Sequence, residues 1–63
     1  MVGRVTRRWD EDGMPMALVK GDDGEQRACL LYVPEASAGS RVLVHAGFAV
    51  ELLGPDETEE AST

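Results

Sequence analysis

Apolar and polar residues alternate along most of the chain in short runs, and clusters of Asp and Gly separate these runs. Alternation with a period of two is typical of strands with one buried face. Asp and Gly clusters are typical of turns, because Gly accepts a positive φ and Asp stabilises a turn through its side chain. The pattern predicts five strands, at residues 2–9, 14–20, 25–33, 41–46 and 48–53. The last of these could also be the bent second half of the fourth.

The connections follow from the same signals. Residues 10–13 are predicted to form a turn and residues 21–24 a hairpin loop. Pro15 confines the second strand to an edge or marks its start, because proline has no backbone N–H. Pro34 is expected to end the third strand, and one helical turn could follow it before residue 41. Both faces of the third strand are apolar near its end, so we expect it to lie deep or to bend.

The clearest alternation is at residues 41–46. One predicted face carries Arg41, Leu43 and His45, and the other carries Val42, Val44 and Ala46. Gly47 then interrupts the pattern, and a glycine within a strand pattern marks a bulge or a tight corner of a barrel. We therefore expect His45 at the surface of the domain, beside this glycine.

Short strands separated by turn signals predict an all-β fold. Five strands with a glycine corner fit a small OB-like five-stranded barrel, and a two-sheet SH3-like roll is the competing architecture. We expect the barrel domain to cover residues 1–54. Residues 55–63 are expected to form a short, disordered acidic tail. The carboxylate side chains of this tail are Asp56, Glu57, Glu59 and Glu60.

The 63 residues make one domain with a small core. A core of this size stabilises a fold by only about 3–5 kcal/mol. Cys29 is the single cysteine and His45 the single histidine, so the chain can build neither an internal disulfide nor a zinc cage of about four ligands. A partner or self-association is therefore the expected source of further stability.

The net charge of −6 argues against a nucleic-acid partner. A face that binds nucleic acid needs clustered basic residues, and the aromatic residues of this chain are isolated in its sequence. A membrane span needs about 20 apolar residues, and no run approaches that length. A lone thiol is typical of a reducing compartment. We expect no nucleic-acid partner, no membrane partner and a cytoplasmic location.

Two side chains bear candidate chemistry. His45 could contact a metal ion or a partner through its imidazole, or it could be a structural histidine. Cys29 could be a thiolate stabilised by Arg27, or a buried small hydrophobic residue, which is the commoner role of a free cysteine. A nucleophilic pair of Cys29 and His45 would need an orienting third group that the sequence does not show. We therefore expect a binding protein and not an enzyme.

Residues 33–50 go beyond a strand pattern. They read Val33-Pro34-Glu35-Ala36, then Gly39, then Val42-Leu43-Val44-His45-Ala46-Gly47-Phe48-Ala49-Val50. This order resembles the signature of the HypC/HupF family, small chaperones for assembly of the nickel–iron hydrogenase active site. Ser40 and Arg41 stand where the family usually has Asp and an aromatic residue. The upstream runs Gly3-x-Val5 and Arg27-x-Cys29-Leu30-x-Tyr32 are also similar, so the resemblance covers about residues 1–53.

The resemblance implies an OB-like barrel with no enzymatic activity of its own. It implies two partners, a HypD-like scaffold protein and the hydrogenase large-subunit precursor, during insertion of an iron–cyanide–carbonyl group that is held only transiently. His45 matches the functional histidine of the family and is the candidate metal ligand. Together with Gly47 and Phe48, it makes the expected partner-binding site.

The family's second functional residue is a Cys directly after the initiator Met. It has no counterpart here, because the chain opens Met1-Val2-Gly3. Two interpretations stay open. The natural start could lie upstream and include the Cys, in which case an in-frame Met-Cys-Leu precedes Met1. Alternatively, the chain is a variant barrel that acts as a structural or protein-interaction subunit without a metal role. Cys29 is not assumed to replace the missing thiolate.

Overall fold

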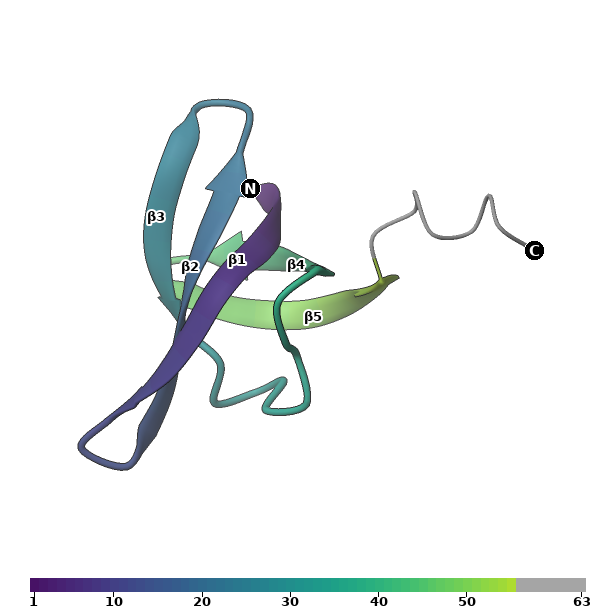
Figure 1. Ribbon diagram of the computed structural model, residues 1–63. Coiled ribbons are helices and arrows are strands. Elements are labelled where there is room, and N and C mark those ends of the chain that lie inside the picture. Colours follow the sequence, from purple (N-terminus) through teal and green to yellow (C-terminus); the bar gives the residue numbers. More distant parts are fainter. Residues whose placement is uncertain (56–63) are drawn as a thin grey trace.

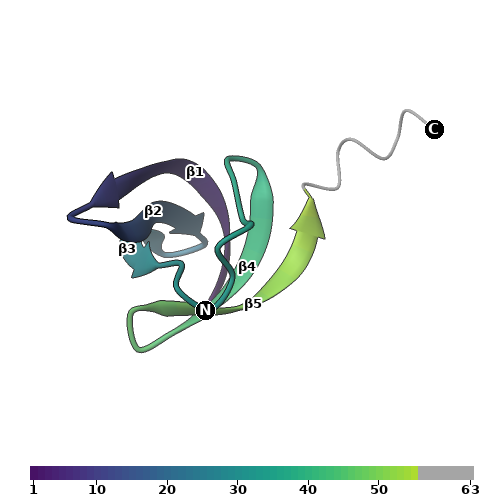
Figure 2. The same ribbon diagram turned by 90° about the horizontal axis from the view of Figure 1, so that it is seen from below.

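The computed structural model describes residues 1–55, with side chains for residues 1–54; this part of the chain forms five strands and no helix (Figure 1). The strands are β1 (Val2–Glu11), β2 (Met14–Gly21), β3 (Gly24–Cys29), β4 (Ser40–His45) and β5 (Phe48–Pro55). They close into a barrel in the order β1-β2-β3-β5-β4 (Figure 2). All neighbours are antiparallel except β3 and β5, which are parallel. The OB-like five-stranded barrel predicted from the sequence is confirmed.

The first hairpin is longer than predicted, because its turn contains only two residues. Glu11 pairs with Met14, so the turn consists of Asp12 and Gly13, whose φ angles are 54° and 85°. Positive φ at both central residues is what a type I′ turn requires, and the twist of this turn matches that of the flanking strands. The strand therefore continues through two residues that the sequence assigned to the turn.

The β4–β5 connection is also a two-residue hairpin turn. His45 pairs with Phe48, and the residues between them are Ala46 and Gly47, with φ angles of 52° and 85°. The sequence predicted a bulge or a barrel corner at Gly47, whereas Gly47 lies in the turn itself. The register irregularities of this strand pair lie elsewhere, at Arg41/Val42 and Leu43/Val44.

The third strand is shorter than predicted. It ends at Cys29, not at Val33, and the residues that follow form successive turns without a helix. The N–H of Val33 donates to the carbonyl of Leu30 (3.0 Å), and the N–H of Ala36 donates to the carbonyl of Val33 (3.0 Å). The strand has therefore already ended before Pro34, and no helical turn follows this proline.

This run of turns explains the misleading apolar pattern. Leu30, Val33 and Ala36 are spaced three residues apart and are all buried, whereas the intervening Leu31 and Tyr32 are exposed. Turns closed by i to i+3 hydrogen bonds bring every third residue to the same side. The segment therefore covers one end of the barrel with three apolar side chains instead of extending β3.

The barrel interior is filled by small aliphatic side chains. The buried cluster consists of Val5, Ala17, Val19, Ala28, Leu30, Val33, Ala36, Val42, Val44 and Ala49. Val42 and Val44 point inward and His45 is exposed, so the predicted faces are confirmed for these residues. The prediction was wrong for Ala46, which was expected on the inward face but is exposed in the β4–β5 turn, because β4 ends at His45. The predicted tail lies outside the described residues, apart from the backbone of Pro55 at the end of β5. Within the described part of the chain, no helix has the length and apolarity to cross a membrane.

Candidate functional site

His45 lies at the very end of β4, one residue before the β4–β5 turn. Its side chain is exposed, because the preceding Val44 occupies the inward position. The start of the chain lies beside this strand end. The ammonium group of Met1 donates to the carbonyl of Val44 (2.7 Å), and the N–H of Val44 donates to the carbonyl of Met1 (2.7 Å). His45 is therefore held at the end of a strand that pairs with β5 on one edge and with the N-terminal residues on the other.

Phe48 is the first residue of β5, the strand that lies between β3 and β4 in the barrel. It pairs with His45 on β4 and with Cys29 on β3. The N–H of Cys29 donates to the carbonyl of Gly47 (2.9 Å), which ties the turn to the end of β3. Phe48 is 37% exposed, and its ring centroid lies 5.5 Å from that of Tyr32, which is also exposed. The predicted residues His45, Gly47 and Phe48 therefore form one hairpin tip with an aromatic pair beside it.

The register extends this tip into a row that crosses every strand. Directly paired residues project from the same face of a sheet. The consecutive partners, which we call the outer row, are Trp9, Met16, Cys29, Phe48 and His45. The row faces outward, because the residues next to it along the strands, such as Ala17, Ala28 and Ala49, are in the core. Four strand spacings of about 4.8 Å give it a length of about 19 Å along the barrel wall.

The outer row places Cys29 and His45 on either side of Phe48. Their backbones are two strand spacings apart, which is about 10 Å. Cys29 is only 8% exposed, so it is buried, as the interpretation as a small hydrophobic residue expects. Among the described residues, no cluster of three or more His, Cys, Asp or Glu side chains could hold a metal ion. His45 is thus an accessible imidazole without a protein-built metal cage around it in residues 1–55.

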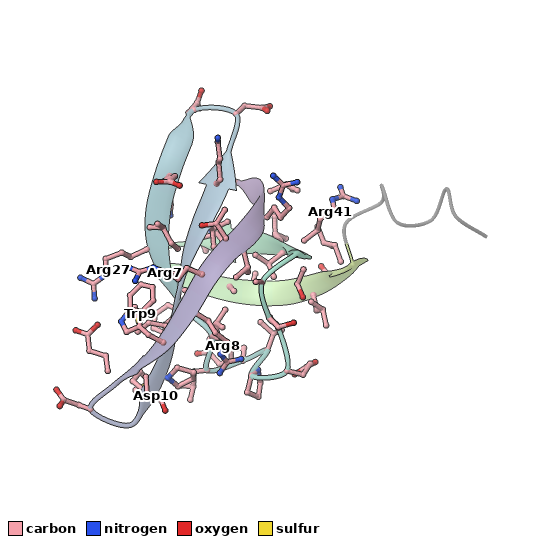
Figure 3. The ribbon with its side chains drawn as sticks, viewed as in Figure 1. Arg7, Arg8, Trp9, Asp10, Arg27 and Arg41 are labelled. Atoms are coloured by element: carbon pink, nitrogen blue, oxygen red, sulfur yellow. The ribbon has the colours of Figure 1, made fainter. Side chains whose placement is uncertain are left out.

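The Val-Pro-Glu-Ala part of the motif has a structural role. The Arg8 guanidinium donates to the carbonyls of Pro34 (2.8 Å) and Ala36 (2.5 Å), and the side chain turns away from its neighbours on β1 toward this segment (Figure 3). Val33 and Ala36 are buried against the core. This part of the motif therefore closes the barrel end, while the part around His45 lies at the surface.

The sequence did not identify the other end of the outer row. Trp9 and Met16 face each other because the two-residue turn at Asp12 and Gly13 fixes the hairpin register. An Asp-Gly turn of this kind could have predicted the pairing. The pairing of Cys29 with Phe48 is parallel and non-local, so no signal near either residue announces it.

Comparison with known proteins agrees with these features. The model of the HupF/HypC family matches residues 1–63. Comparisons with curated proteins and with solved structures gave no significant match. The family consists of hydrogenase maturation chaperones. With the family match over its full length, the chain belongs to the HupF/HypC family.

Proposed function

We propose that this hydrogenase maturation chaperone docks on a HypD-like scaffold protein and on the hydrogenase large-subunit precursor through the tip formed by His45, Gly47 and Phe48. The observation that carries the proposal is an exposed imidazole at the end of β4, directly before a two-residue turn and next to an exposed aromatic pair. Aromatic residues dominate the energy of protein interfaces, since they bury a large area at low entropic cost. The proposed location is the cytoplasm.

The tip is suited to docking because its backbone is fixed. The N–H of Cys29 donates to the carbonyl of Gly47, and Phe48 is paired on both of its sides. Binding groups on regular strands lose less conformational entropy on association than groups on free loops. The backbone that carries the His45 imidazole is therefore presented to a partner in a nearly constant position.

In this proposal the iron–cyanide–carbonyl group is cargo and not a resident cofactor. His45 offers one nitrogen donor, and Cys29 is buried on the far side of Phe48. Metal sites in proteins take several ligands, so the partner or the cargo itself would supply the others. The chaperone's own contribution is to hold or orient the group with one imidazole while the partner is bound.

The position of Met1 allows a thiolate to be engineered beside His45. Val2 pairs with Leu43, and Met1 exchanges backbone hydrogen bonds with Val44. In this antiparallel register, a residue placed ahead of Met1 would lie opposite His45 and on the same outward face. A chain extended by one Cys ahead of Met1 would bring a thiolate next to the imidazole. We expect the extended chain to retain iron better than the present chain, as measured by iron analysis after co-purification with the scaffold protein.

The proposal is tested by a pull-down of the scaffold protein and of the large-subunit precursor, together with a hydrogenase maturation assay. The variants are wild type, His45→Ala and the matched control Gln26→Ala, which alters an exposed side chain on β3 away from the tip. We expect His45→Ala to reduce maturation at least about tenfold, the loss of roughly one interfacial hot spot. The control should behave like wild type.

The outcomes separate the proposal from its alternative. Retained binding with lost maturation would assign His45 to the cargo, and loss of both would assign it to docking as well. Unchanged binding and maturation in His45→Ala would remove His45 from the site and leave a barrel that acts only as a protein-interaction subunit. Failure of the wild type to bind either partner would refute the proposed function.

A further inference from the structure

At the Trp9 end of the outer row, the charged side chains of Arg7, Arg27 and Glu11 surround the indole. None of these residues belongs to the motif at residues 33–50. The Arg7 guanidinium lies 4.9 Å from the centre of the Trp9 ring, and that of Arg27 lies 5.9 Å from it. The indole N–H donates to Glu11 (3.2 Å), and Arg27 forms an ion pair with the same carboxylate (2.7 Å). Figure 3 shows Arg7, Trp9 and Arg27 gathered on one side of the sheet formed by β1, β2 and β3.

These contacts fix the indole before any partner arrives. Arg27 on β3 is held by Glu11 on β1, and the Trp9 indole contacts both side chains. Cation–π contacts contribute about 0.5–1 kcal/mol at exposed sites and more when water is removed. A partner that covers this group would therefore strengthen contacts that already exist, with little ordering cost.

Arg7 differs from Arg27 in its charge partner. Within residues 1–55, Arg7 stacks on Trp9 but forms no ion pair with a carboxylate, whereas Arg27 has Glu11. A guanidinium presents parallel N–H groups that match the two oxygens of a carboxylate. The cationic group at this end of the row is thus suited to a carboxylate from outside the chain.

The surface between Arg7 and the hairpin tip is apolar. Met16 lies next to Trp9, and Met14, one position further along the same face of β2, is 40% exposed. At the other end, Phe48 is 37% and Tyr32 is 63% exposed. Exposed aromatic and methionine side chains flanked by arginine are the composition that protein interfaces favour.

We propose that the Trp9 end of the outer row docks a protein segment that places a carboxylate on Arg7 and an apolar side chain on Trp9 and Met16. The inference rests on the proposed function, because the segment belongs to one of the two proteins that dock at the His45 tip. It extends that docking site from one end of the outer row to the other, about 19 Å along the wall. A contact of this length fits the 800 Å² or so that each partner buries in a stable interface.

The charges nearby favour a protein segment over a nucleic acid. Asp10, Glu11 and Asp12 lie on the same hairpin as Trp9, and the chain carries a net charge of −6. A single-stranded nucleic acid needs a basic groove that follows its backbone. A protein segment that carries one carboxylate needs only the guanidinium of Arg7. Its apolar side chain needs no charged partner on the barrel.

The test measures dissociation constants for the scaffold protein and for the large-subunit precursor by biolayer interferometry. The variants are Arg7→Glu, Trp9→Ala, Trp9→Phe and Lys20→Glu. Lys20 is exposed and outward-facing at the opposite end of β2, so Lys20→Glu makes the same charge change away from the row. We expect Arg7→Glu and Trp9→Ala to weaken one partner at least about tenfold. Trp9→Phe and Lys20→Glu should change it less than about threefold.

The outcomes distinguish this inference from the function on which it rests. If His45→Ala weakens binding but Arg7→Glu and Trp9→Ala do not, the proposed function stands and the inference is overturned. If the wild type binds neither protein, both fail. A single-stranded oligonucleotide that binds wild type but not Trp9→Ala, or a wild-type dimer that Trp9→Ala converts to a monomer, would also overturn the inference, because the face would then serve another occupant. Circular dichroism of each variant checks that the barrel is folded.

Discussion

Gly3 is the position at which one added methyl group should damage the barrel most. It is a buried residue of β1 that pairs with Val42 of β4, and the next residue, Arg4, pairs with Lys20 of β2. A Cβ atom at Gly3 would lie 2.6 Å from Cγ1 of Val19, 2.7 Å from the carbonyl oxygen of Lys20 and 3.1 Å from its carbonyl carbon. Two of these atoms belong to the backbone of β2, so a rotamer change cannot relieve the clash. Gly3→Ala therefore requires β1 and β2 to move apart.

The size of the effect follows from opposing terms. Overpacking a well-filled interior costs about 1–3 kcal/mol, and a clash with backbone belongs at the upper end. Replacing Gly by Ala reduces the entropy of the unfolded chain, which offsets about 0.4–1 kcal/mol. The net loss is about 2 kcal/mol, out of the roughly 3–5 kcal/mol available to a domain of this size. The ratio of unfolded to folded protein would rise about 30-fold.

Urea denaturation followed by circular dichroism measures this loss, with Gly21→Ala as the matched control. A Cβ atom at Gly21 would meet the terminal methyl group of the Met1 side chain first, and the carbonyl oxygen of Val2 at 3.1 Å. The Met1 side chain is 42% exposed and can move aside. We expect Gly21→Ala to cost less than about 1 kcal/mol. Equal midpoints for the two variants would contradict this expectation, because they would show that β1 and β2 tolerate the added methyl.

Three further predictions test other parts of the fold. Arg8→Ala should lower the free energy of unfolding by about 1.5 kcal/mol in urea denaturation, because the carbonyls of Pro34 and Ala36 lose a charged donor; an unchanged midpoint would show that this segment closes the barrel without Arg8. Ala46→Asn should raise the melting temperature, since Ala46 has a φ of 52° and Asn adopts this region at a cost lower by about 1 kcal/mol; a lower melting temperature would contradict the type I′ turn. Cys29 is 8% exposed, so it should react with Ellman's reagent at least about 100-fold more slowly in the native protein than in urea, and equal rates would contradict its burial.

The elements that could be predicted are those whose signals are local. The alternation at residues 41–45 assigned the inward and outward faces of β4 correctly, since each side chain reports only on its own strand. The Asp and Gly clusters located the first two hairpins, although the first turn proved two residues shorter at its start. The end of β3 was missed because a run of apolar residues reads the same in a strand and in successive turns. The structure shows the difference: Leu30, Val33 and Ala36, which are three residues apart, are buried, whereas a strand would bury every second residue.

Of the candidate site, only the end of the outer row that contains His45 could be predicted from the sequence. The residues around His45 resemble a family signature, and the strand pattern placed His45 at the surface. The row that joins His45 to Trp9 depends on the closure of the barrel, which is made by the single parallel pair of Cys29 and Phe48. Closure of this kind is non-local, and no propensity or turn residue encodes it. The sequence therefore left Tyr32 and Phe48 as isolated aromatics, whereas their rings are in contact.

The way in which the barrel is filled explains why its surface is suited to binding. Its largest fully buried side chain is Leu30, and the remainder of the core is valine and alanine. The chain has three aromatic residues, and none of them is in this core. Aromatic side chains bury about 150–250 Å² each when they are covered. A small domain that leaves them at its surface therefore lacks the free energy of folding that this burial would contribute. A partner that covers the outer row would recover that burial. The same outward aromatic side chains that make the isolated barrel marginal would then stabilise the complex, and the barrel should melt at a higher temperature when its partner is bound.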